Sequence, residues 1–390
     1  MSRSSLHNYG CRVSDEWTFR GMRAAILENE LLRVVILLDK GAEIVEFRYK
    51  PLDLDPLLRM PGELRNPSQG RASIEGSGGT YLDYYAGGWQ EVLPNGGGPV
   101  TYKGADYGQH GEVALMAWSS EVIDDGPEYV SLRCSVRALR TPLLLQRTMT
   151  LKRNQAVLFL DEQLTNEAGE ALDIMWGHHV AFGLPFIRHG ATITTSARQL
   201  LVHGEMAGFE PRRLKVDQDT RWPIAMTQSN GEIDMSVVPA QSEANGREMA
   251  YLTDFDGPAW YAITNHDQQA GFAMRWDGDL FRYLWLWQEF AYARGFPWWG
   301  RTYTMALGAV DELSNRRLAR GDQTKHAARA ATGADRDNSA HRLSVFRTGD
   351  RKRHRGRRNG RGTKILSNDD ARPFQTRKPD KRVIDAHNRH

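Results

Sequence analysis

Residues 24–49 read AAILENELLRVVILLDKGAEIVEFRY, and this stretch decides the fold. Ala24–Leu38 is rich in Leu, Val and Ile, and Asp39-Lys40-Gly41 has the composition of a turn in which glycine adopts a positive φ without strain. Ala42–Tyr49 then alternates apolar and polar side chains, which is the period of a β-strand. Two such runs separated by a short turn predict a β-hairpin.

Apolar runs of the same kind continue through the first 310 residues, with turn residues between them. They are Val130–Leu139, Leu143–Leu151, Ala156–Leu164, Ala191–Thr195, Trp260–Thr264, Gly271–Trp276 and Tyr303–Leu307. Few segments show the 3.6-residue period of a helix, and strands do not alternate with helices, which argues against a doubly wound or TIM-type sheet. Many short strands at close spacing predict an all-β fold, as a large antiparallel β-sandwich or a barrel.

Charge and aromatic content divide the chain of 390 residues into two parts. From Arg316 to His390 there are 22 Lys and Arg against 8 Asp and Glu, whereas all 11 Trp lie before Gly300. A highly charged segment with few large apolar side chains cannot offset its ordering entropy by burial. We therefore expect a folded domain over residues 1–310 and a disordered basic tail over residues 311–390.

Several classes of protein are disfavoured by what the sequence lacks. No run of about 18 apolar residues indicates a transmembrane helix, and the first ten residues have no apolar core of a secretory signal. Cys11 and Cys134 are too few for a disulfide framework or a cysteine zinc cluster, which favours a reducing, cytoplasmic setting. Motifs of nucleotide-binding loops, serine hydrolases and zinc proteases are absent, so we expect neither a cofactor nor a metal.

Four polar clusters interrupt the predicted strands and are candidates for a binding site. Gly87–Gly98 contributes Trp89, Gln90, Glu91 and Asn95; Gln109–Glu112 contributes His110 and Glu112; Trp176–Gly183 contributes His178 and His179; and Leu284–Arg301 contributes Trp287, Gln288, Glu289 and Arg301 among further tryptophans. If Trp176–Gly183 is extended, its two histidines point to opposite faces, so that one can face a pocket and the other solvent. Indoles stack on sugar rings, amides and carboxylates bind hydroxyls, and histidine suits proton transfer near neutral pH. Each cluster also has a structural alternative: a glycine-rich turn, a hydrogen-bonded loop histidine, a buried histidine, or tryptophans of the core.

Taken together, GWQEVLPNGGGP, GQHGEVALMAW, HHVAFGLPF, LWLWQEF and PWWGRTYTMAL resemble the aldose 1-epimerase (galactose mutarotase-like) superfamily, and within it the less characterised branch with an HGE loop. LLRVVILLDKGAEIVEF is also similar to the first strands of that family. The resemblance spans about Ala24 to Leu307. It implies a galactose mutarotase-like supersandwich with a sugar cleft across one sheet, a monosaccharide or sugar derivative as ligand, and cofactor-free interconversion of α and β anomers.

The resemblance also implies roles for individual residues. His179 matches the histidine that protonates the ring oxygen, and His110 matches a second histidine that binds or orients the sugar. The other candidates for sugar contacts are Trp89, Gln90, Glu91, Asn95, Glu112, His178, Trp287, Gln288, Glu289 and Arg301. Arg301 or Arg71 would suit an acidic or phosphorylated sugar.

The catalytic base that the resemblance implies is missing. That base is a glutamate at the end of a late strand, and here Tyr303–Leu307 is followed by Gly308. Reading the gene one nucleotide later from Gly308 can yield Glu-Pro-Trp within the limits of synonymous codons, so the residues after Leu307 fit an out-of-frame translation. Loss of a positioned base costs on the order of 10²–10⁴-fold in rate, so we expect an impaired enzyme.

Two alternatives stay open. The same cleft would serve a non-catalytic carbohydrate-binding protein, which Gly308 favours. The basic run Arg351–Arg361 would bind nucleic acid non-specifically and with strong salt dependence, although it has no aromatic side chains for base stacking. Nothing in the sequence indicates a membrane partner or defines an oligomeric state.

Overall fold

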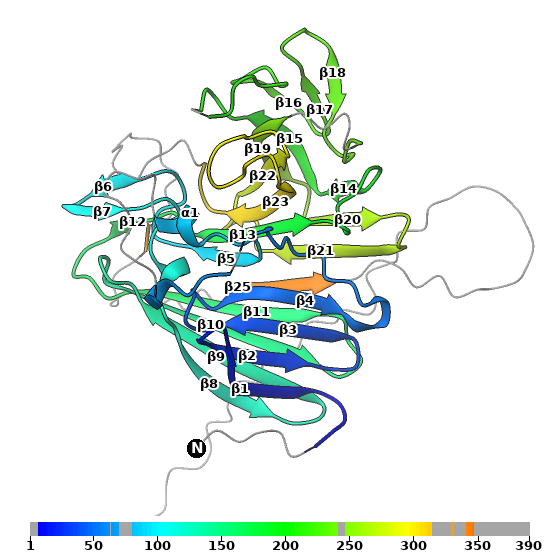
Figure 1. Ribbon diagram of the computed structural model, residues 1–390. Helices are drawn as coiled ribbons and strands as arrows, with labels where there is room; N and C mark the ends of the chain where they lie inside the picture. The colour runs from blue at the N-terminus through cyan, green and yellow to red at the C-terminus, as the bar shows by residue number, and fades with distance from the viewer. Residues whose placement is uncertain are drawn as a thin grey trace, which may run out of the picture. The chain divides into compact units, whose positions relative to one another are not determined.

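Two large antiparallel sheets make up the protein, and the prediction of an all-β antiparallel sandwich is confirmed (Figure 1). The computed structural model describes residues 7–62, 64–69, 80–206, 208–240 and 246–313, with the backbone of 329–330 and 341–346. The larger sheet has 11 strands in the order β1 (Arg12–Phe19), β2 (Met22–Glu28), β3 (Leu32–Leu37), β4 (Glu43–Tyr49), β5 (Trp89–Val92), β13 (Gly177–Gly183), β23 (Tyr303–Val310), β22 (Tyr283–Phe290), β19 (Arg247–Phe255), β15 (Ala197–Val202) and β16 (Asp219–Arg221).

The second sheet has eight strands, and short elements fill the connections. Its order is β14 (Thr192–Thr195), β20 (Ala259–Asn265), β21 (Ala270–Trp276), β25 (His341–Phe346), β11 (Leu158–Asn166), β10 (Leu143–Lys152), β9 (Tyr129–Arg137) and β8 (Ser119–Asp125). Three two-stranded ribbons pair β6 (Val100–Tyr102) with β7 (Ala105–Tyr107), β12 (Leu172–Asp173) with β24 (Arg329–Ala330), and β17 (Ile224–Met226) with β18 (Glu232–Asp234). The helical segments are α1 (Thr80–Tyr84), η1 (Lys50–Leu52), η2 (Pro67–Gln69) and η3 (Val113–Leu115). Among the described residues, no helix has the length and apolar character needed to cross a bilayer.

The N-terminal apolar run forms two strands rather than one. Asn29 interrupts it, because its side-chain oxygen accepts the backbone N–H groups of Leu31 (2.8 Å) and Leu32 (2.7 Å) and so closes a tight turn between β2 and β3. The predicted hairpin follows as β3 and β4. Gly41 in its turn has a φ of +68°, and a Cβ there would collide with the backbone of Ala114.

The main core lies between the two sheets. Leu27 and Val34 of the larger sheet and Leu132, Met149 and Leu160 of the second sheet are fully buried in one apolar cluster. In Figure 1, β1–β4 lie against β8–β11. Along β10, buried and half-buried residues alternate, so one face of that strand meets the core.

Most of the predicted tail lies outside the described residues, including the basic run Arg351–Arg361. Within the tail, the backbone of His341–Phe346 pairs with β11 on one side and β21 on the other. Asp311 lies just past the predicted boundary at residue 310 and is fully buried, where its carboxylate accepts the backbone N–H of Trp176 at 2.8 Å.

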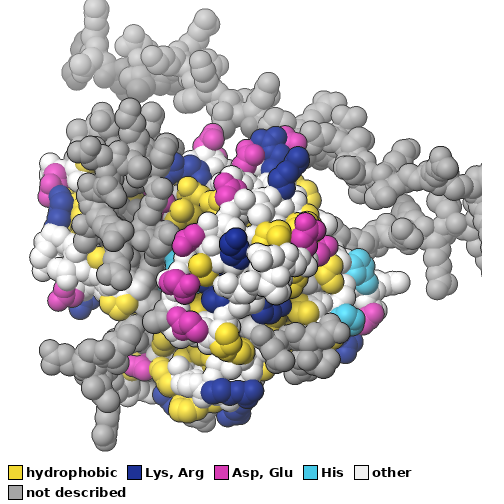
Figure 2. All heavy atoms as spheres, turned by 90° about the horizontal axis from the view of Figure 1, so that it is seen from above, with side chains coloured by type: hydrophobic (Ala, Val, Ile, Leu, Met, Phe, Trp, Pro, Cys, Tyr) yellow, Lys and Arg dark blue, Asp and Glu magenta, His cyan; other side chains and the backbone are white. Residues whose placement is uncertain are grey.

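Acidic and basic side chains are mixed on the face that Figure 2 shows. Asp, Glu, Lys and Arg side chains alternate there with small hydrophobic areas. The residues coloured in Figure 2 therefore present a surface of mixed charge on this face rather than a uniformly basic one.

Candidate functional site

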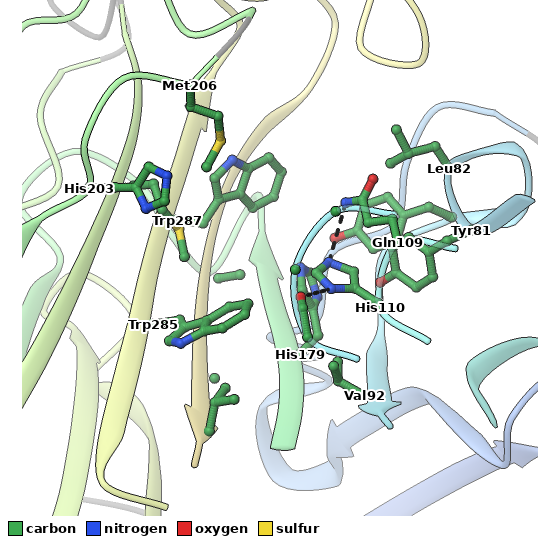
Figure 3. A pocket seen from close by; sticks show the side chains of 18 of the residues that line it. Tyr81, Leu82, Val92, Gln109, His110, His179, His203, Met206, Trp285 and Trp287 are labelled. Atoms are coloured by element: carbon green, nitrogen blue, oxygen red, sulfur yellow. Dashed lines mark hydrogen bonds between the residues drawn. The ribbon is translucent and has the colours of Figure 1, made fainter. Parts of the chain in front are cut away.

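A pocket of about 750 Å³ lies on the face of the larger sheet that points away from the inter-sheet core (Figure 3). Residues of β13, β19, β22 and β23 line it, together with α1 and the loops that carry Gly97, His203 and Trp298. The volume falls in the range of roughly 300–1,000 Å³ that small-molecule sites occupy.

Two neighbouring imidazoles from distant parts of the chain meet in this pocket. The rings of His110 and His179 have centroids 5.5 Å apart. His110 reaches the pocket from a loop in which it has a φ of +59° and Gly111 a φ of +78°. His179 comes from β13, where the strand's alternation turns it away from the core. The structure therefore brings the two histidines together at one cavity.

The hydrogen-bond partners assign the proton of His110. Its Nδ1 lies 2.6 Å from the carbonyl oxygen of Gly96, and a carbonyl only accepts, so Nδ1 carries the proton. Its Nε2, 3.4 Å from the amide nitrogen of Gln109, is then an acceptor. In His179, Nδ1 is buried and has no hydrogen-bond partner among the described residues.

Burial keeps both imidazoles neutral at physiological pH. It lowers the pKa of His110 to about 4, although the hydrogen bond to Gly96 opposes the shift. It lowers the pKa of His179 to about 3, and the proximity of His110 adds to the effect. A neutral pair offers N–H donors and lone-pair acceptors, which matches hydroxyl groups that both donate and accept.

Aromatic rings surround the two histidines. The ring of Tyr85 lies 5.4 Å from His179 and that of Tyr81 lies 4.7 Å from His110, both edge to face. Trp287 lies 6.1 Å from His179 on the other side and contacts Trp298 at 5.1 Å. Trp285 also lines the pocket. The result is an apolar wall around a small polar patch, which is the general build of a small-molecule site.

Gly308 lies on the pocket floor in β23, beside β13. A Cβ at this position would collide with the carbonyl oxygen of His178 and lie 3.6 Å from the Cα of His179. The strand therefore approaches β13 more closely than a residue with a side chain allows. In this chain the floor has no room for a side chain at residue 308.

The far end of the pocket contains a third histidine and an arginine. Burial lowers the pKa of His203 to about 4, and its Nδ1 is hydrogen-bonded to the hydroxyl of Tyr251. Arg247 lies over the ring of Phe209, with the guanidinium carbon 4.2 Å from the ring centroid, and 5.5 Å from that of Trp298. Both His203 and Arg247 line the pocket.

A buried ionic cluster lies beneath the pocket floor, between the two sheets. Glu91 and His178 come from the larger sheet, and Arg147 and Glu162 from the second one. Nε2 of His178 lies 3.1 Å from Glu162, and a guanidinium nitrogen of Arg147 lies 3.3 Å from Glu91. Because His178 alternates with His179 along β13, its side chain points into the core and not into solvent, as its 1% exposure shows.

Proton positions in this cluster follow from its donors. Burial and the charge of Glu162 raise the pKa of Glu91 to about 7. Burial alone would lower the pKa of His178, but the carboxylates of Glu162 and Glu91 raise it. These carboxylates favour the charged ring, but the hydrogen bonds decide for the neutral one: the indole N–H of Trp89 lies 3.1 Å from Nδ1 of His178 and can only donate, so Nδ1 accepts and Nε2–H donates to Glu162.

The same cluster is the one group of three ligand-type side chains among the described residues whose geometry would suit a metal ion. Arg147 already supplies the positive charge there, and the indole of Trp176 donates to Glu91 at 2.5 Å. The charges of the cluster are therefore already paired within it, which does not favour a further cation, although Nε of Arg147 and one carboxylate oxygen of Glu162 have no hydrogen-bond partner among the described residues.

Most of the other residues predicted from sequence support the pocket without lining it. Of the twelve, His110, His179 and Trp287 face it, and His178 borders it. The structure places Trp89 (0% exposed) in the inter-sheet core and Glu91 in the ionic cluster, because β5 turns these faces inward. Gln90 accepts the hydroxyl of Tyr81 at 3.3 Å, and Asn95 donates to the carbonyl of Gly98 at 2.8 Å, so both hold parts of the rim.

The remaining predicted residues lie outside the pocket. Glu112 accepts the backbone N–H of Arg140 at 3.1 Å. Gln288 accepts from Arg213 at 2.9 Å on the opposite face of β22 from Trp287. Glu289 is fully buried and accepts the backbone N–H groups that follow β22, and Arg301 is exposed. Arg71 lies outside the described residues.

Sequence reasoning missed several lining residues. Tyr81 and Tyr85 are four apart, which is the spacing of neighbours on one helix face, and this was an available signal. His203, Phe209 and Arg247 had no signal of their own, because each is a single side chain far along the chain from the two histidines. Only strand pairing between β15, β19 and β22 brings them to the pocket.

Comparison with known proteins identifies the fold. The structure is similar to a candidate aldose 1-epimerase from Klebsiella pneumoniae (TM-score 0.66, 15% identity, 87% of this chain and 83% of that chain). It is also similar to a candidate aldose 1-epimerase from Escherichia coli K12 (0.55, 14%, 84% and 99%) and to a galactose mutarotase-like protein from Clostridium acetobutylicum (0.54, 12%, 87% and 98%). At these identities the likeness shows the fold alone, which is galactose mutarotase-like.

A search of curated proteins finds no match. A family profile described as a domain of unknown function, DUF4432, matches residues 19–307, which is most of the chain. The chain therefore belongs to the DUF4432 family.

Proposed function

We propose that this protein binds a monosaccharide or sugar derivative in the pocket around His110 and His179. One observation carries the proposal: two neutral imidazoles stand side by side in an aromatic-walled cavity of about 750 Å³. Indole and phenol faces suit the apolar side of a sugar ring, and imidazoles suit its hydroxyls. The galactose mutarotase-like fold adds support, since relatives of that fold include candidate aldose 1-epimerases.

We further propose that interconversion of anomers in this pocket is slow. Ring opening needs a proton at the ring oxygen and an acceptor for the proton of the anomeric hydroxyl. With a pKa of about 3, only roughly one His179 ring in 10⁴ is an imidazolium at pH 7. Among the described residues that line the pocket, Glu205 is the only carboxylate and it is exposed, so a buried base is lacking.

A purely non-catalytic carbohydrate-binding role is the second candidate, and Gly308 favours it. The pocket floor has no room for a carboxylate at residue 308, where the resemblance would put the base. Both candidates use the same cleft and the same histidines. They differ only in whether bound sugar exchanges its anomers faster than free sugar.

Calorimetric titration with a panel of aldoses tests binding, and NMR exchange spectroscopy of the α and β anomers tests catalysis. We expect binding that is lost in His179→Gln, with an exchange rate in the presence of wild-type protein well below that of an efficient enzyme. Binding with no acceleration at all would select the non-catalytic role. Failure of every aldose and sugar derivative to bind would refute the proposal.

We also propose that the residues after Leu307 arise from out-of-frame translation of the gene. The family match ends at residue 307, immediately before Gly308. Sequencing of the gene around codon 308 should reveal a small insertion or deletion, and an uninterrupted frame would rule this origin out. A cytoplasmic location and non-specific binding of nucleic acid by Arg351–Arg361 stay predictions.

A further inference from the structure

Arg247 is the only Lys or Arg among the described residues that line the pocket. Its guanidinium carbon lies 4.2 Å from the ring centroid of Phe209 and 5.5 Å from that of Trp298. Aromatic rings at these distances attract a guanidinium through cation–π contacts and leave its N–H groups for hydrogen bonds. Because Trp298 contacts Trp287, and Trp287 contacts His179, one continuous aromatic wall joins the arginine to the histidine pair.

The protein uses only part of the hydrogen-bonding capacity of Arg247. One Nη1–H donates to the carbonyl of Gly208 at 3.1 Å. Nε lies 3.3 Å from a carboxylate oxygen of Glu289 without hydrogen-bond geometry. No described residue accepts from Nη2, and Nη2 is not among the fully buried polar atoms without a partner. Because Arg247 lines the pocket, Nη2 leaves one edge of the guanidinium available to a ligand.

Only one carboxylate oxygen of Glu289 lies near Arg247. Its other oxygen accepts the backbone N–H groups of Tyr292 (2.8 Å) and Ala293 (2.9 Å), which stabilise the carboxylate independently of the arginine. Because the formal charges of Arg247 and Glu289 cancel, the pair offers directed N–H donors rather than net positive charge, which suits a monoanion better than a dianion.

We propose that the pocket selects sugars that carry a carboxylate, such as hexuronic acids, and that Arg247 binds this group. The inference rests on the proposed function, since it names the class of sugar for the same pocket. The sugar ring would lie along the aromatic wall with its hydroxyls at His110 and His179. The carboxylate would accept N–H groups from the free edge of Arg247.

Paired sugars that differ only at C6 test this directly. Calorimetric titration of the full chain compares D-glucuronate with D-glucose and D-galacturonate with D-galactose, and includes D-glucose 6-phosphate as the dianion. A charge-assisted hydrogen bond predicts that at least one uronate binds about 10-fold more tightly than its neutral partner and more tightly than the phosphate.

Two variants locate the preference. Arg247→Met with Glu289→Gln removes both charges at once, so no buried carboxylate is left unpaired, and it should bring the ratio of uronate affinity to neutral-sugar affinity close to one. Arg301→Met removes an exposed arginine outside the pocket and should retain the preference.

The outcomes separate this inference from the proposed function. Equal or weaker binding of uronates, or a preference that survives the double substitution, would overturn the role of Arg247 and leave sugar binding intact. Tighter binding of the phosphate would overturn the choice of a monoanion. If neither neutral nor acidic sugars bound, both proposals would fall.

Discussion

Substitution of Gly308 by alanine should destabilise the protein, because the structure leaves no room for a methyl group there. The added Cβ would collide with the carbonyl oxygen of His178 and lie 3.1 Å from its carbonyl carbon. Those atoms are backbone of a central strand, so the strand itself must move. Overpacking of this kind costs about 1–3 kcal/mol, against a gain of about 0.4–1 kcal/mol from a less flexible unfolded chain. The expected net loss is about 1–2 kcal/mol.

Equilibrium unfolding in urea measures this loss as a lower midpoint at an unchanged slope. Gly169→Ala is the matched control, since nothing lies within 4 Å of the position of its Cβ. That control should be neutral or gain up to about 1 kcal/mol. If Gly308→Ala were as stable as Gly169→Ala, the close approach of β23 to β13 would be refuted.

The same reasoning extends to Gly308→Glu. The larger side chain must displace the same backbone, so we expect a less stable protein and no recovery of fast anomer exchange. An exchange rate at least 10²-fold above wild type, in a protein of unchanged stability, would show that the floor accommodates a carboxylate after all.

Three further predictions concern the histidines and the ionic cluster. His178→Gln should lower the free energy of unfolding and leave the sugar affinity of the folded protein intact, whereas His179→Gln should leave stability nearly unchanged and abolish sugar binding. Urea unfolding measures the stability of the two variants and calorimetry measures their sugar affinity. The reverse pattern would show that the roles of the two histidines are exchanged. The pKa values of His110 (about 4) and His179 (about 3) in the folded state lie below the unfolded value near 6.5, so the folded state binds fewer protons than the unfolded state. The free energy of unfolding should therefore fall by a few kcal/mol from pH 6.5 to pH 4, and by less in the double variant His110→Gln with His179→Gln. An equal loss in the double variant would contradict the assignment of two neutral histidines. Arg147→Met should lower the free energy of unfolding by about 3–5 kcal/mol, because it leaves buried carboxylates uncompensated. Arg153→Met, on the surface, should lower it by at most about 1 kcal/mol. Equal losses would refute the importance of the buried cluster.

Strand pattern and turn chemistry in the sequence were sufficient to predict the class of fold. The hairpin around Gly41 follows from the two-residue alternation of Ala42–Tyr49 and a turn that tolerates positive φ. The missed break at Asn29 shows the limit of apolar runs, because one side-chain oxygen that accepts two backbone N–H groups ends a strand within a continuous hydrophobic pattern.

In the candidate site, the sequence predicts side-chain directions only for residues within a strand, where neighbours point to opposite faces. His178 and His179 point to opposite faces, as adjacent residues in a strand do, but the second face is the sandwich core and not solvent. Glu91 was predicted in the cleft on residue type, whereas its neighbours in space, Arg147 and Glu162, come from the other sheet. Contacts between residues of the two sheets depend on how the sheets stack on each other. A pattern of neighbouring residues in the sequence does not specify that stacking.

The central claim is that His110 and His179 contact a sugar while His178 does not. Nitrogen-15 NMR of the imidazole rings, recorded on the full chain during titration with the sugar that binds most tightly, measures this most directly. The account predicts that the ring nitrogens of His110 and His179 shift in proportion to the bound fraction and that those of His178 stay in place. A saturating sugar that left His110 and His179 unshifted would contradict the account.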